Sequence, residues 1–316
     1  MSMTSCTIHI KDEVNIKISD LTTATRRKLE KELKFFMPYA RHTPAYKLGR
    51  WDGCVGFFTL GGASYFNLLD KILPIIVDEG YLVEIDDQRK PQDFTFVEVT
   101  ETTHNQTIWP KGHVNEGQPV LLRDYQVDSI NKFLNNLQCV QEISTGAGKT
   151  ITTATLSKSV QSYGRTLIVV PNKDLVRQTL EDYELLGLDV GVYFGDKKEL
   201  GKTHTICTWQ SLNSVQKRFK EGDSPISLED FSEDLIAIIV DEVHQAKADV
   251  LKALLSGPFA NIPIRWGLTG TIPKEDFEQL GLVACIGPVV NRIAAKELQD
   301  KGVLANCLVN VLQLQD

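Results

Sequence analysis

One stretch of seven residues has the composition of a phosphate-binding loop. It reads Ser144, Thr145, Gly146, Ala147, Gly148, Lys149 and Thr150, between the strand-like run Cys139–Ile143 and a helical stretch. Two glycines allow the backbone to curl so that its N–H groups point at phosphate oxygens at a helix N-terminus. Lys149 can bring its charge to the β- and γ-phosphates, and the Thr150 hydroxyl can ligate Mg²⁺. Although Ile143 replaces the first glycine of the strict GxxxxGK[ST] pattern, the stretch predicts a nucleoside triphosphate site.

An adjacent pair of acids, Asp241 and Glu242, is the second chemical signal. The pair directly follows the apolar run Leu235–Val240 and precedes His244. A buried strand that ends in acids places carboxylates at the carboxyl edge of a parallel sheet, where ligands of such sheets bind. We expect Asp241 to hold the Mg²⁺ that bridges the phosphates, and Glu242 to orient or deprotonate the attacking water. His244 is a weaker candidate in isolation, because a lone histidine is more often structural.

The elements that position these groups follow a parallel-sheet rhythm. Short apolar runs alternate with helical stretches, as expected for buried parallel strands with helices on both faces. The strand candidates are Thr166–Val170, Asp189–Phe194, Thr205–Thr208 and Leu235–Val240. We therefore predict an α/β fold with a mostly parallel sheet for residues 116–316.

The first hundred residues predict a separate α+β unit. Thr7–Ile18 alternates as a hairpin with one wet face, and Tyr81–Ile85 could close the sheet. A helix over Thr22–Phe36 would place Leu29, Leu33 and Phe36 on one face. A second helix over Phe66–Glu79 would be kinked or ended by Pro74.

The region from Lys90 to Pro119 is the best candidate for a linker between the two units. It holds three prolines and many polar residues, although the alternating Phe94, Phe96 and Val97 could add a strand. We place the boundary so that residues 1–115 form the N-terminal accessory domain.

Composition limits the classes of function. The net charge is −7, with 34 Lys and Arg against 41 Asp and Glu, so that any nucleic-acid binding must be local. The six cysteines contain no CxxC pair, which favours reduced thiols in a cytosolic compartment over disulfides or a zinc ribbon. The N-terminus lacks the pattern of a signal peptide, and no apolar run approaches the roughly 20 residues that span a bilayer. These features predict a cytoplasmic protein without a membrane partner.

The motifs together resemble the superfamily 2 helicases and translocases of the DExH type. Asp241 to His244 reads DEVH, and the other matching elements are Leu122–Gln126 (LRDYQ), Pro171–Gln178 (PNKDLVRQ), Thr208–Leu212 (TWQSL) and Leu268–Thr271 (LTGT). The resemblance implies a RecA-like lobe that uses ATP and Mg²⁺. It places Gln126 on the adenine edge with Arg123 nearby. Thr269 and Thr271 fall in the motif that couples hydrolysis to movement, and His244 joins the catalytic residues.

The same resemblance implies a nucleic-acid edge on the motor lobe. Its expected contacts are Pro171, Asn172, Lys173, Gln178, Thr208, Gln210 and Ser211. These residues belong to the motifs Pro171–Gln178 and Thr208–Leu212, and each motif follows a predicted strand at the same edge of the sheet. Hydroxyls, backbone N–H groups and helix N-termini can track a phosphate backbone there without a generally basic surface.

A basic stretch marks the N-terminal unit. Between Arg26 and Arg50, eight basic residues stand against Glu30 and Glu32, although several could pair along a solvated helix. On the glycine-flexed loop that follows, Lys47, Arg50 and Trp51 could stack on exposed bases or wedge a duplex junction. Trp51 could equally be an anchor in the core.

The loop and the residues after it resemble the small N-terminal domain of phage UvsW-type helicases, which remodel replication forks and Holliday junctions. The resemblance implies an ATP-dependent DNA helicase or translocase that acts on branched DNA in the host-cell cytoplasm, in replication, recombination or repair. Two alternatives stay open, namely an XPB-like or restriction-type duplex translocase subunit and a non-motor, nucleic-acid-binding ATPase switch.

The C-terminal part of the sequence predicts one motor lobe. Gly302–Asp316 resembles the strand that leads out of a first lobe, and no second lobe or QxxGRxxR-like element follows. Because an arginine finger contributes roughly 10³–10⁵ in rate to related phosphoryl transfers, we expect a fragment that binds nucleotide and hydrolyses it poorly.

Overall fold

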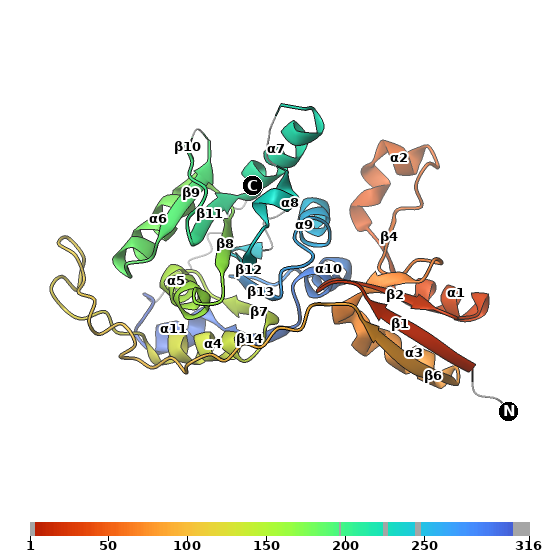
Figure 1. Ribbon diagram of the computed structural model, residues 1–316, viewed down its shortest axis with the longest axis horizontal. Helices are drawn as coiled ribbons and strands as arrows, with labels where there is room; N and C mark the ends of the chain where they lie inside the picture. Colours follow the sequence, from red (N-terminus) through yellow and green to blue (C-terminus); the bar gives the residue numbers. More distant parts are fainter. Residues whose placement is uncertain (1–3, 196, 224–226, 244–247, 306–316) are drawn as a thin grey trace, which may run out of the picture.

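Two units make up the protein, an N-terminal α+β unit and a larger α/β lobe (Figure 1). The computed structural model describes residues 4–195, 197–223, 227–243 and 248–305. Within these ranges no helix is long and apolar enough to cross a membrane. The five cysteines that the structure describes, Cys6, Cys54, Cys139, Cys207 and Cys285, are free.

The N-terminal unit is built on a four-stranded sheet of order β5-β2-β1-β6. The strands are β1 (Thr4–Ile10), β2 (Asn15–Ser19), β5 (Ala63–Tyr65) and β6 (Tyr81–Asp87). The predicted hairpin and closing strand are confirmed, since β2 is antiparallel and β6 parallel to β1. Ile8 lies opposite Ile18 and Ile10 opposite Ile16, and these isoleucines are buried in one apolar cluster with helix residues Leu29 and Ile72. The helices are α1 (Thr23–Glu32), the short η2 (Phe66–Leu68) and α3 (Leu69–Asp78).

Both predicted helices of this unit differ in detail from the structure. Helix α1 ends at Glu32, and Leu29 and Leu33 are buried as expected. Phe36, however, is 39% exposed and lies on a strand, because Lys34–Phe36 (β3) pairs with Cys54–Gly56 (β4). Pro74 does not end α3, because the helix continues to Asp78. Pro74 is on the exposed side, where water can hydrogen-bond the carbonyl that its ring deprives of a helical partner.

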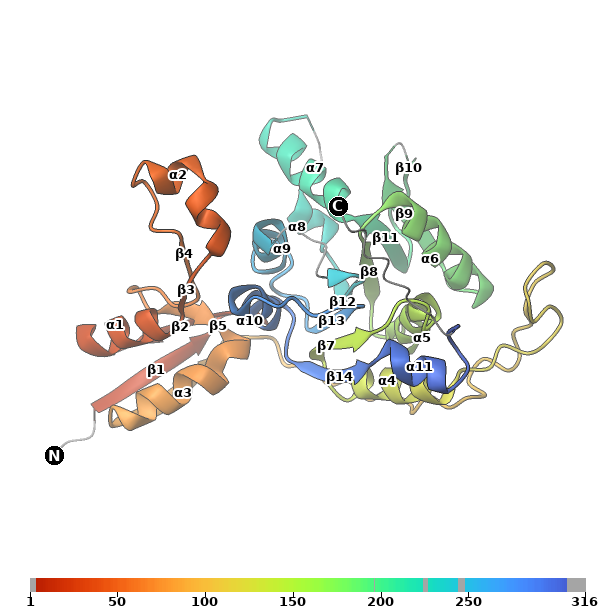
Figure 2. The same ribbon diagram turned by 180° about the vertical axis from the view of Figure 1, so that it is seen from behind.

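An arm, residues 37–53, projects from the β3-β4 pair. It contains η1 (Pro38–His42) and α2 (Pro44–Lys47), and both views show it standing away from the four-stranded sheet (Figures 1 and 2). Thr43 caps α2, since its side chain accepts a hydrogen bond from the backbone N–H of Tyr46. The arm carries the exposed basic residues Arg41, Lys47 and Arg50 away from the core of the unit.

The segment from residue 88 to 123 is irregular and contacts the larger α/β lobe, which begins with α4 at Asp124 and is called the motor lobe here after the sequence resemblance. Its backbone forms one isolated bridge, between Ile108 and Pro119, so the strand considered for Phe94–Val97 is wrong. Phe94 and Phe96 instead pack edge-on against Tyr163 of the lobe, with ring centroids 5.1 and 5.7 Å from it. The boundary at residue 115 stays a prediction.

The motor lobe has an eight-stranded sheet of order β10-β9-β11-β8-β12-β13-β7-β14. All neighbours are parallel except β9 and β10. The strands are β7 (Gln138–Ile143), β8 (Arg165–Val170), β9 (Val190–Phe194), β10 (Lys197–Lys198), β11 (His204–Thr208), β12 (Leu235–Val240), β13 (Ile264–Thr269) and β14 (Val289–Ile293). The α/β fold and the predicted strands are confirmed, whereas β10, β13 and β14 were not predicted. The strand expected within Gly302–Asp316 lies mostly outside the described residues, and residues 302–305 are not a strand.

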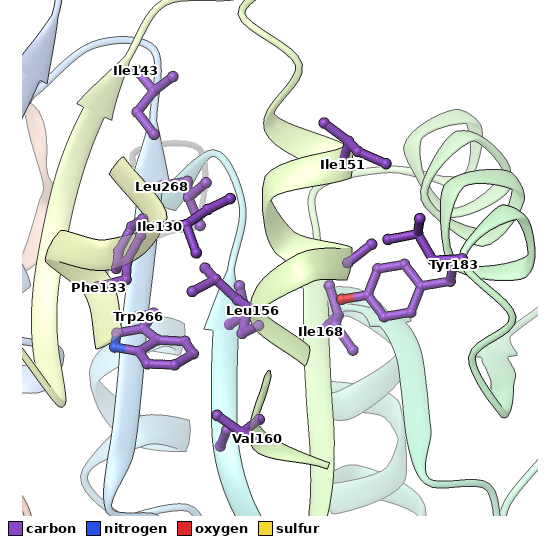
Figure 3. Close-up of a cluster of buried hydrophobic side chains, with 14 of the residues drawn as sticks. Ile130, Phe133, Ile143, Ile151, Leu156, Val160, Ile168, Tyr183, Trp266 and Leu268 are labelled. Carbon is purple, nitrogen blue, oxygen red and sulfur yellow. The ribbon is translucent and has the colours of Figure 1, made fainter. Parts of the chain in front are cut away.

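Helices cover both faces of this sheet. They are α4 (Asp124–Leu134), α5 (Lys149–Val160), α6 (Lys173–Leu185), α7 (Trp209–Lys220), α8 (Leu228–Phe231), α9 (Ala248–Leu255), α10 (Asp276–Cys285) and α11 (Ala295–Asp300). One apolar cluster joins α4, α5 and α6 to alternate strand residues, and Figure 3 shows Phe133 beside Trp266 there. A second apolar cluster contains residues of the four helices α7, α8, α9 and α10 and the strand residues that point to that face of the sheet. The sheet is therefore buried on both faces.

Arg265 ties β13 to the helices on one face. Its guanidinium is fully buried and donates to the carbonyls of Leu255 (2.8 Å), Phe259 (2.6 Å) and Cys285 (2.8 Å). Burial lowers the pKa of Arg265 to about 10. A single side chain thus satisfies the carbonyls at the ends of α9 and α10.

We predict that Arg265→Met lowers the free energy of unfolding by about 3 kcal/mol, because several buried carbonyls lose their donors. Urea unfolding followed by circular dichroism measures the change. Arg292→Met is the control, since Arg292 is 69% exposed and its substitution should change the stability by no more than about 0.5 kcal/mol. A loss below about 1 kcal/mol for Arg265→Met would contradict the structural role.

Candidate nucleotide site and nucleic-acid edge

The phosphate loop has the backbone geometry that its glycines predict. The loop joins β7 to α5, and Gly146 and Gly148 have φ angles of +84° and +80°. A Cβ on Gly148 would lie 2.4 Å from Nε2 of Gln126. Both this clash and the positive φ exclude a side chain at position 148. Ser144 is anchored to β14, because its hydroxyl donates to the Ile293 carbonyl at 2.9 Å. Helix α5 begins at Lys149, which puts a helix N-terminus at the loop.

Lys149, Glu242 and Gly270 form one buried cluster. Lys149 and Glu242 make an ion pair, and the second carboxylate oxygen of Glu242 accepts from the Gly270 N–H at 3.1 Å. Glu242 has φ of +48°, a conformation that costs free energy in a residue with a side chain. A Cβ on Gly270 would lie 3.3 Å from the hydroxyl of Thr145. The phosphate loop, the acid pair and the LTGT loop therefore meet, as the sequence predicts.

Asp241 is a buried carboxylate at the end of β12. Burial raises the pKa of Asp241 to about 6, and the nearby Lys149 acts in the opposite direction. One of its oxygens accepts from the backbone N–H of Glu242 at 2.9 Å. A divalent cation would offset the cost of burying this charge, so Asp241 fits the role of a Mg²⁺ ligand.

Thr150 and Thr269 take different positions around the cluster. The Thr150 side chain hydrogen-bonds Asp182 of α6, whose pKa is raised by burial despite that bond. Thr269 is buried at the end of β13 and donates to the carbonyl of Thr271 at 2.8 Å, whereas Thr271 is exposed. Thr269 thereby fixes the turn that presents Gly270 to Glu242. His244 lies outside the described residues.

Gln126 braces the phosphate loop from outside. Its carbonyl oxygen accepts from the Arg123 N–H at 2.9 Å, and its amide donates to the Ala147 carbonyl at 3.0 Å. The Tyr125 hydroxyl donates to the same carbonyl at 3.0 Å and also receives a hydrogen bond from Arg123. The adenine contacts expected of Gln126 and Arg123 stay predictions.

A cavity of about 570 Å³ opens between this glutamine and α6. Its lining includes Gln126, Gly148, Thr150, Asp182 and residues of the 88–123 segment. Among the latter, Trp109 and His113 stack with ring centroids 3.9 Å apart and planes 10° apart. The volume suits a nucleotide. Sequence reasoning missed Trp109, His113 and Asp182, although an isolated tryptophan among polar residues was a usable signal.

The expected nucleic-acid motifs meet at one edge of the sheet. Asn172 and Thr208 are the N-caps of α6 and α7, and these helices follow β8 and β11, which are adjacent and parallel. Asn172, Lys173, Gln178 and Gln210 are exposed. Pro171, Thr208 and Ser211 are buried, and the Thr208 hydroxyl accepts from the Ser211 N–H at 3.3 Å. Burial and capping assign Thr208 and Ser211 a structural role here, and their contacts with nucleic acid stay a prediction.

The arm presents two of its three expected contacts to solvent. Lys47 and Arg50 are exposed, and Leu48 between them is 64% exposed. Trp51 is partly buried against the core of the unit, and its indole N–H donates to the Cys54 carbonyl at 3.0 Å. This position favours the core-anchor alternative for Trp51. The arm and the phosphate loop lie on different units (Figure 2).

Comparisons with known proteins agree with this site. Residues 119–274 match the family described as type III restriction enzyme, res subunit. The ATP-dependent DNA helicase uvsW of Enterobacteria phage T4 is 22% identical over 319 residues, covering 98% of this chain and 60% of that protein. The DNA 3'-5' translocase XPB2 of Sulfurisphaera tokodaii is 30% identical over 181 residues, covering 57% of this chain and 37% of that protein.

The crystal structure of the UvsW helicase from bacteriophage T4 shares the fold, with a TM-score of 0.69 at 20% identity, covering 91% of this chain and 99% of that chain. The chain spans about 60% of the length of the uvsW relative and about 37% of the XPB2 relative. The family match covers the phosphate loop, the acid pair and the Gly270 loop, which meet in one cluster on a RecA-like sheet. The residues that meet in this cluster therefore lie in the part of the chain that matches the type III restriction enzyme, res subunit, family.

Proposed function

We propose that this protein couples ATP hydrolysis to the remodelling of branched DNA, such as forks and Holliday junctions. The observation that carries the proposal is the combination of a motor site with an exposed basic arm on a second unit. The similarity to a relative named ATP-dependent DNA helicase uvsW, over 98% of this chain, supports it.

The residues of the chain divide the work at the nucleotide. Lys149 binds the terminal phosphates, and the N–H groups of the glycine loop hold their oxygens. Asp241 and Thr150 would hold a Mg²⁺ ion, which neutralises phosphate charge when bound. Glu242 is released from Lys149 when phosphate takes the lysine, and it then orients the attacking water and accepts its proton.

The DNA-facing roles rest on exposure and chemistry. Lys173 and Gln210 lie in the first turns of α6 and α7, whose N-termini would hold the phosphate backbone. Gln178 lies further along α6, where it also lines the cavity beside Gln126. On the arm, Lys47 and Arg50 would hold phosphates on either side of a junction. Leu48 would insert as an apolar wedge where bases are unstacked, as such side chains do in other DNA complexes.

A duplex translocase of the XPB kind is the second candidate. It is favoured by the 30% identity with XPB2, which covers 57% of this chain. The two candidates differ in substrate, because only the first gains from a branch point. ATP hydrolysis stimulated equally by linear duplex and by forks would favour the second.

We expect Lys149→Ala and Glu242→Gln to separate binding from turnover. Loss of Lys149 should weaken nucleotide affinity by at least about tenfold, since the charge on the phosphates is lost. Glu242→Gln should bind nucleotide within about threefold of the parent and lower turnover by about 100-fold or more, since it removes a proton acceptor. Titration with a fluorescent ATP analogue and a phosphate-release assay measure the two quantities. Equal losses of affinity in both variants would contradict the assigned roles.

We expect Trp109→Ala to raise the dissociation constant for ATP by about fivefold, because it removes an aromatic wall of the cavity. Trp109→Phe should keep most of the affinity. The measurement is the same fluorescent titration, and Trp51→Ala provides the matched control at a tryptophan of the other unit. Unchanged affinity in Trp109→Ala would place the base elsewhere.

We expect the double variant Lys47→Ala/Arg50→Ala to weaken binding to a fork by at least about tenfold, because two phosphate contacts are lost. ATP affinity should not change. Electrophoretic mobility shifts with a fork, a Holliday junction and a linear duplex of equal length measure the effect. Lys28→Ala/Lys31→Ala, two exposed lysines of α1, is the charge-matched control. An equal loss on all three DNAs would reduce the arm to a non-specific contact.

A further inference from the structure

The N-terminal unit and the motor lobe share an apolar core. Phe277, Leu280 and Ala284 lie on one face of α10, at spacings of three and four residues, and are buried in the cluster that contains Ile8 and Leu29. The ring of Phe277 lies 6.4 Å from that of Tyr39 in η1. Helix α10 begins five residues after Thr271 of the LTGT loop. A motor-lobe helix that follows the LTGT loop in the chain therefore completes the core of the other unit.

Directional hydrogen bonds cross the same boundary beside this core. The backbone N–H of Glu13 donates to the Ala260 carbonyl at 3.0 Å, and the Asn15 amide donates to the Ser256 carbonyl at 2.9 Å. The Asn67 amide donates to Oε1 of Gln138 at 2.7 Å. These bonds start from the β1-β2 turn, from β2 and from η2, so they fix the unit at separate points.

Glu13 joins these contacts into a network. Its carboxylate accepts from Nε2 of Gln138 at 3.0 Å and pairs with Arg89 at 3.1 Å. The guanidinium of Arg89 lies over the ring of Phe66, 4.4 Å from its centroid. Burial raises the pKa of Glu13, and Arg89 opposes that shift. Arg89 holds the Glu13 carboxylate on the N-terminal side of the boundary, and Gln138 of β7 donates to it from the other side. Rotation of one unit against the other would break the hydrogen bond from Gln138 and leave a partly buried carboxylate oxygen without its donor.

We propose that this boundary is a fixed joint, which holds the arm at a constant position relative to the DNA edge of the motor lobe. Glu13, Asn15, Asn67 and Phe277 are its positioning residues. A fixed distance between the arm and the DNA edge would favour branched DNA over linear duplex. A branched molecule would contact the arm and the DNA edge at once, whereas a linear duplex would contact only one of them. The link between the joint and a preference for branched DNA rests on the function proposed above, whereas the rigidity of the joint rests on the contacts across the boundary.

A distance measurement tests the joint without DNA. Spin labels are placed at Lys31→Cys in α1 and Glu184→Cys in α6, both exposed, in a Cys54→Ser/Cys307→Ser background. We expect one narrow distance distribution that ATP and DNA leave unchanged. Glu13→Ala/Asn67→Ala should broaden it, and Glu13→Gln, which keeps an acceptor for Gln138, should broaden it less. Glu79→Ala is the matched control, because Glu79 pairs with Lys28 inside the N-terminal unit. A broad or two-peaked distribution in the labelled parent would overturn the joint.

DNA-stimulated ATP hydrolysis tests the consequence, in the protein as its gene encodes it. We expect Glu13→Ala/Asn67→Ala to lower the ratio of fork-stimulated to duplex-stimulated rates by about fivefold, with the duplex-stimulated rate and ATP affinity unchanged. Circular dichroism confirms folding, and Asn15→Ala serves as a second, milder variant. An unchanged ratio in a variant whose distance distribution is broadened would overturn the coupling. A parent with no preference for forks would instead contradict the proposed function, and the distance measurement would still decide the joint.

Discussion

The contact between Lys149 and Glu242 is the constraint on which the motor site depends. Because the carboxylate also accepts from the Gly270 N–H, three loops that follow β7, β12 and β13 converge on one buried pair. The pair holds Glu242 in a backbone conformation with positive φ, and a Cβ at position 270 would come within 3.3 Å of the Thr145 hydroxyl. A phosphate that binds Lys149 must therefore act on the acid pair and on the LTGT loop together. The helix that follows this loop carries part of the core of the N-terminal unit.

Much of the motor lobe could be predicted from sequence, since local pattern and tertiary environment agree there. Continuous apolar runs such as Leu235–Val240 are buried on both faces, and glycines at 146 and 148 occur where the backbone needs positive φ. Strand β13 was not predicted, because Arg265 interrupts its apolar run. Its charge is tolerated since the ends of α9 and α10 present carbonyls to it, a condition that no local pattern reveals.

The other misses have the same cause, namely partners distant in sequence. Phe36 leaves the helix because β4, some twenty residues later, pairs with its backbone. Trp109 and His113 read as linker residues, and only the fold brings them to the cavity beside Gln126. Thr208 and Ser211 are a different case, because they match a nucleic-acid motif and their hydroxyls also begin α7, so their contacts with nucleic acid stay a prediction. Sequence motifs thus identified the loops that meet around Lys149 and Glu242, and they could not distinguish helix capping from nucleic-acid contact at the N-termini of α6 and α7.

The most direct test of the account is an ATP-dependent fork-regression assay with the protein as its gene encodes it. A fork with homologous arms and a linear duplex of equal length are incubated with protein, Mg²⁺ and ATP. We predict conversion of the fork to its regressed four-way form, dependent on hydrolysable ATP, with strand displacement from the linear duplex slower by about tenfold or more. Hydrolysis of ATP without any change in the fork would contradict the proposed remodelling of branched DNA.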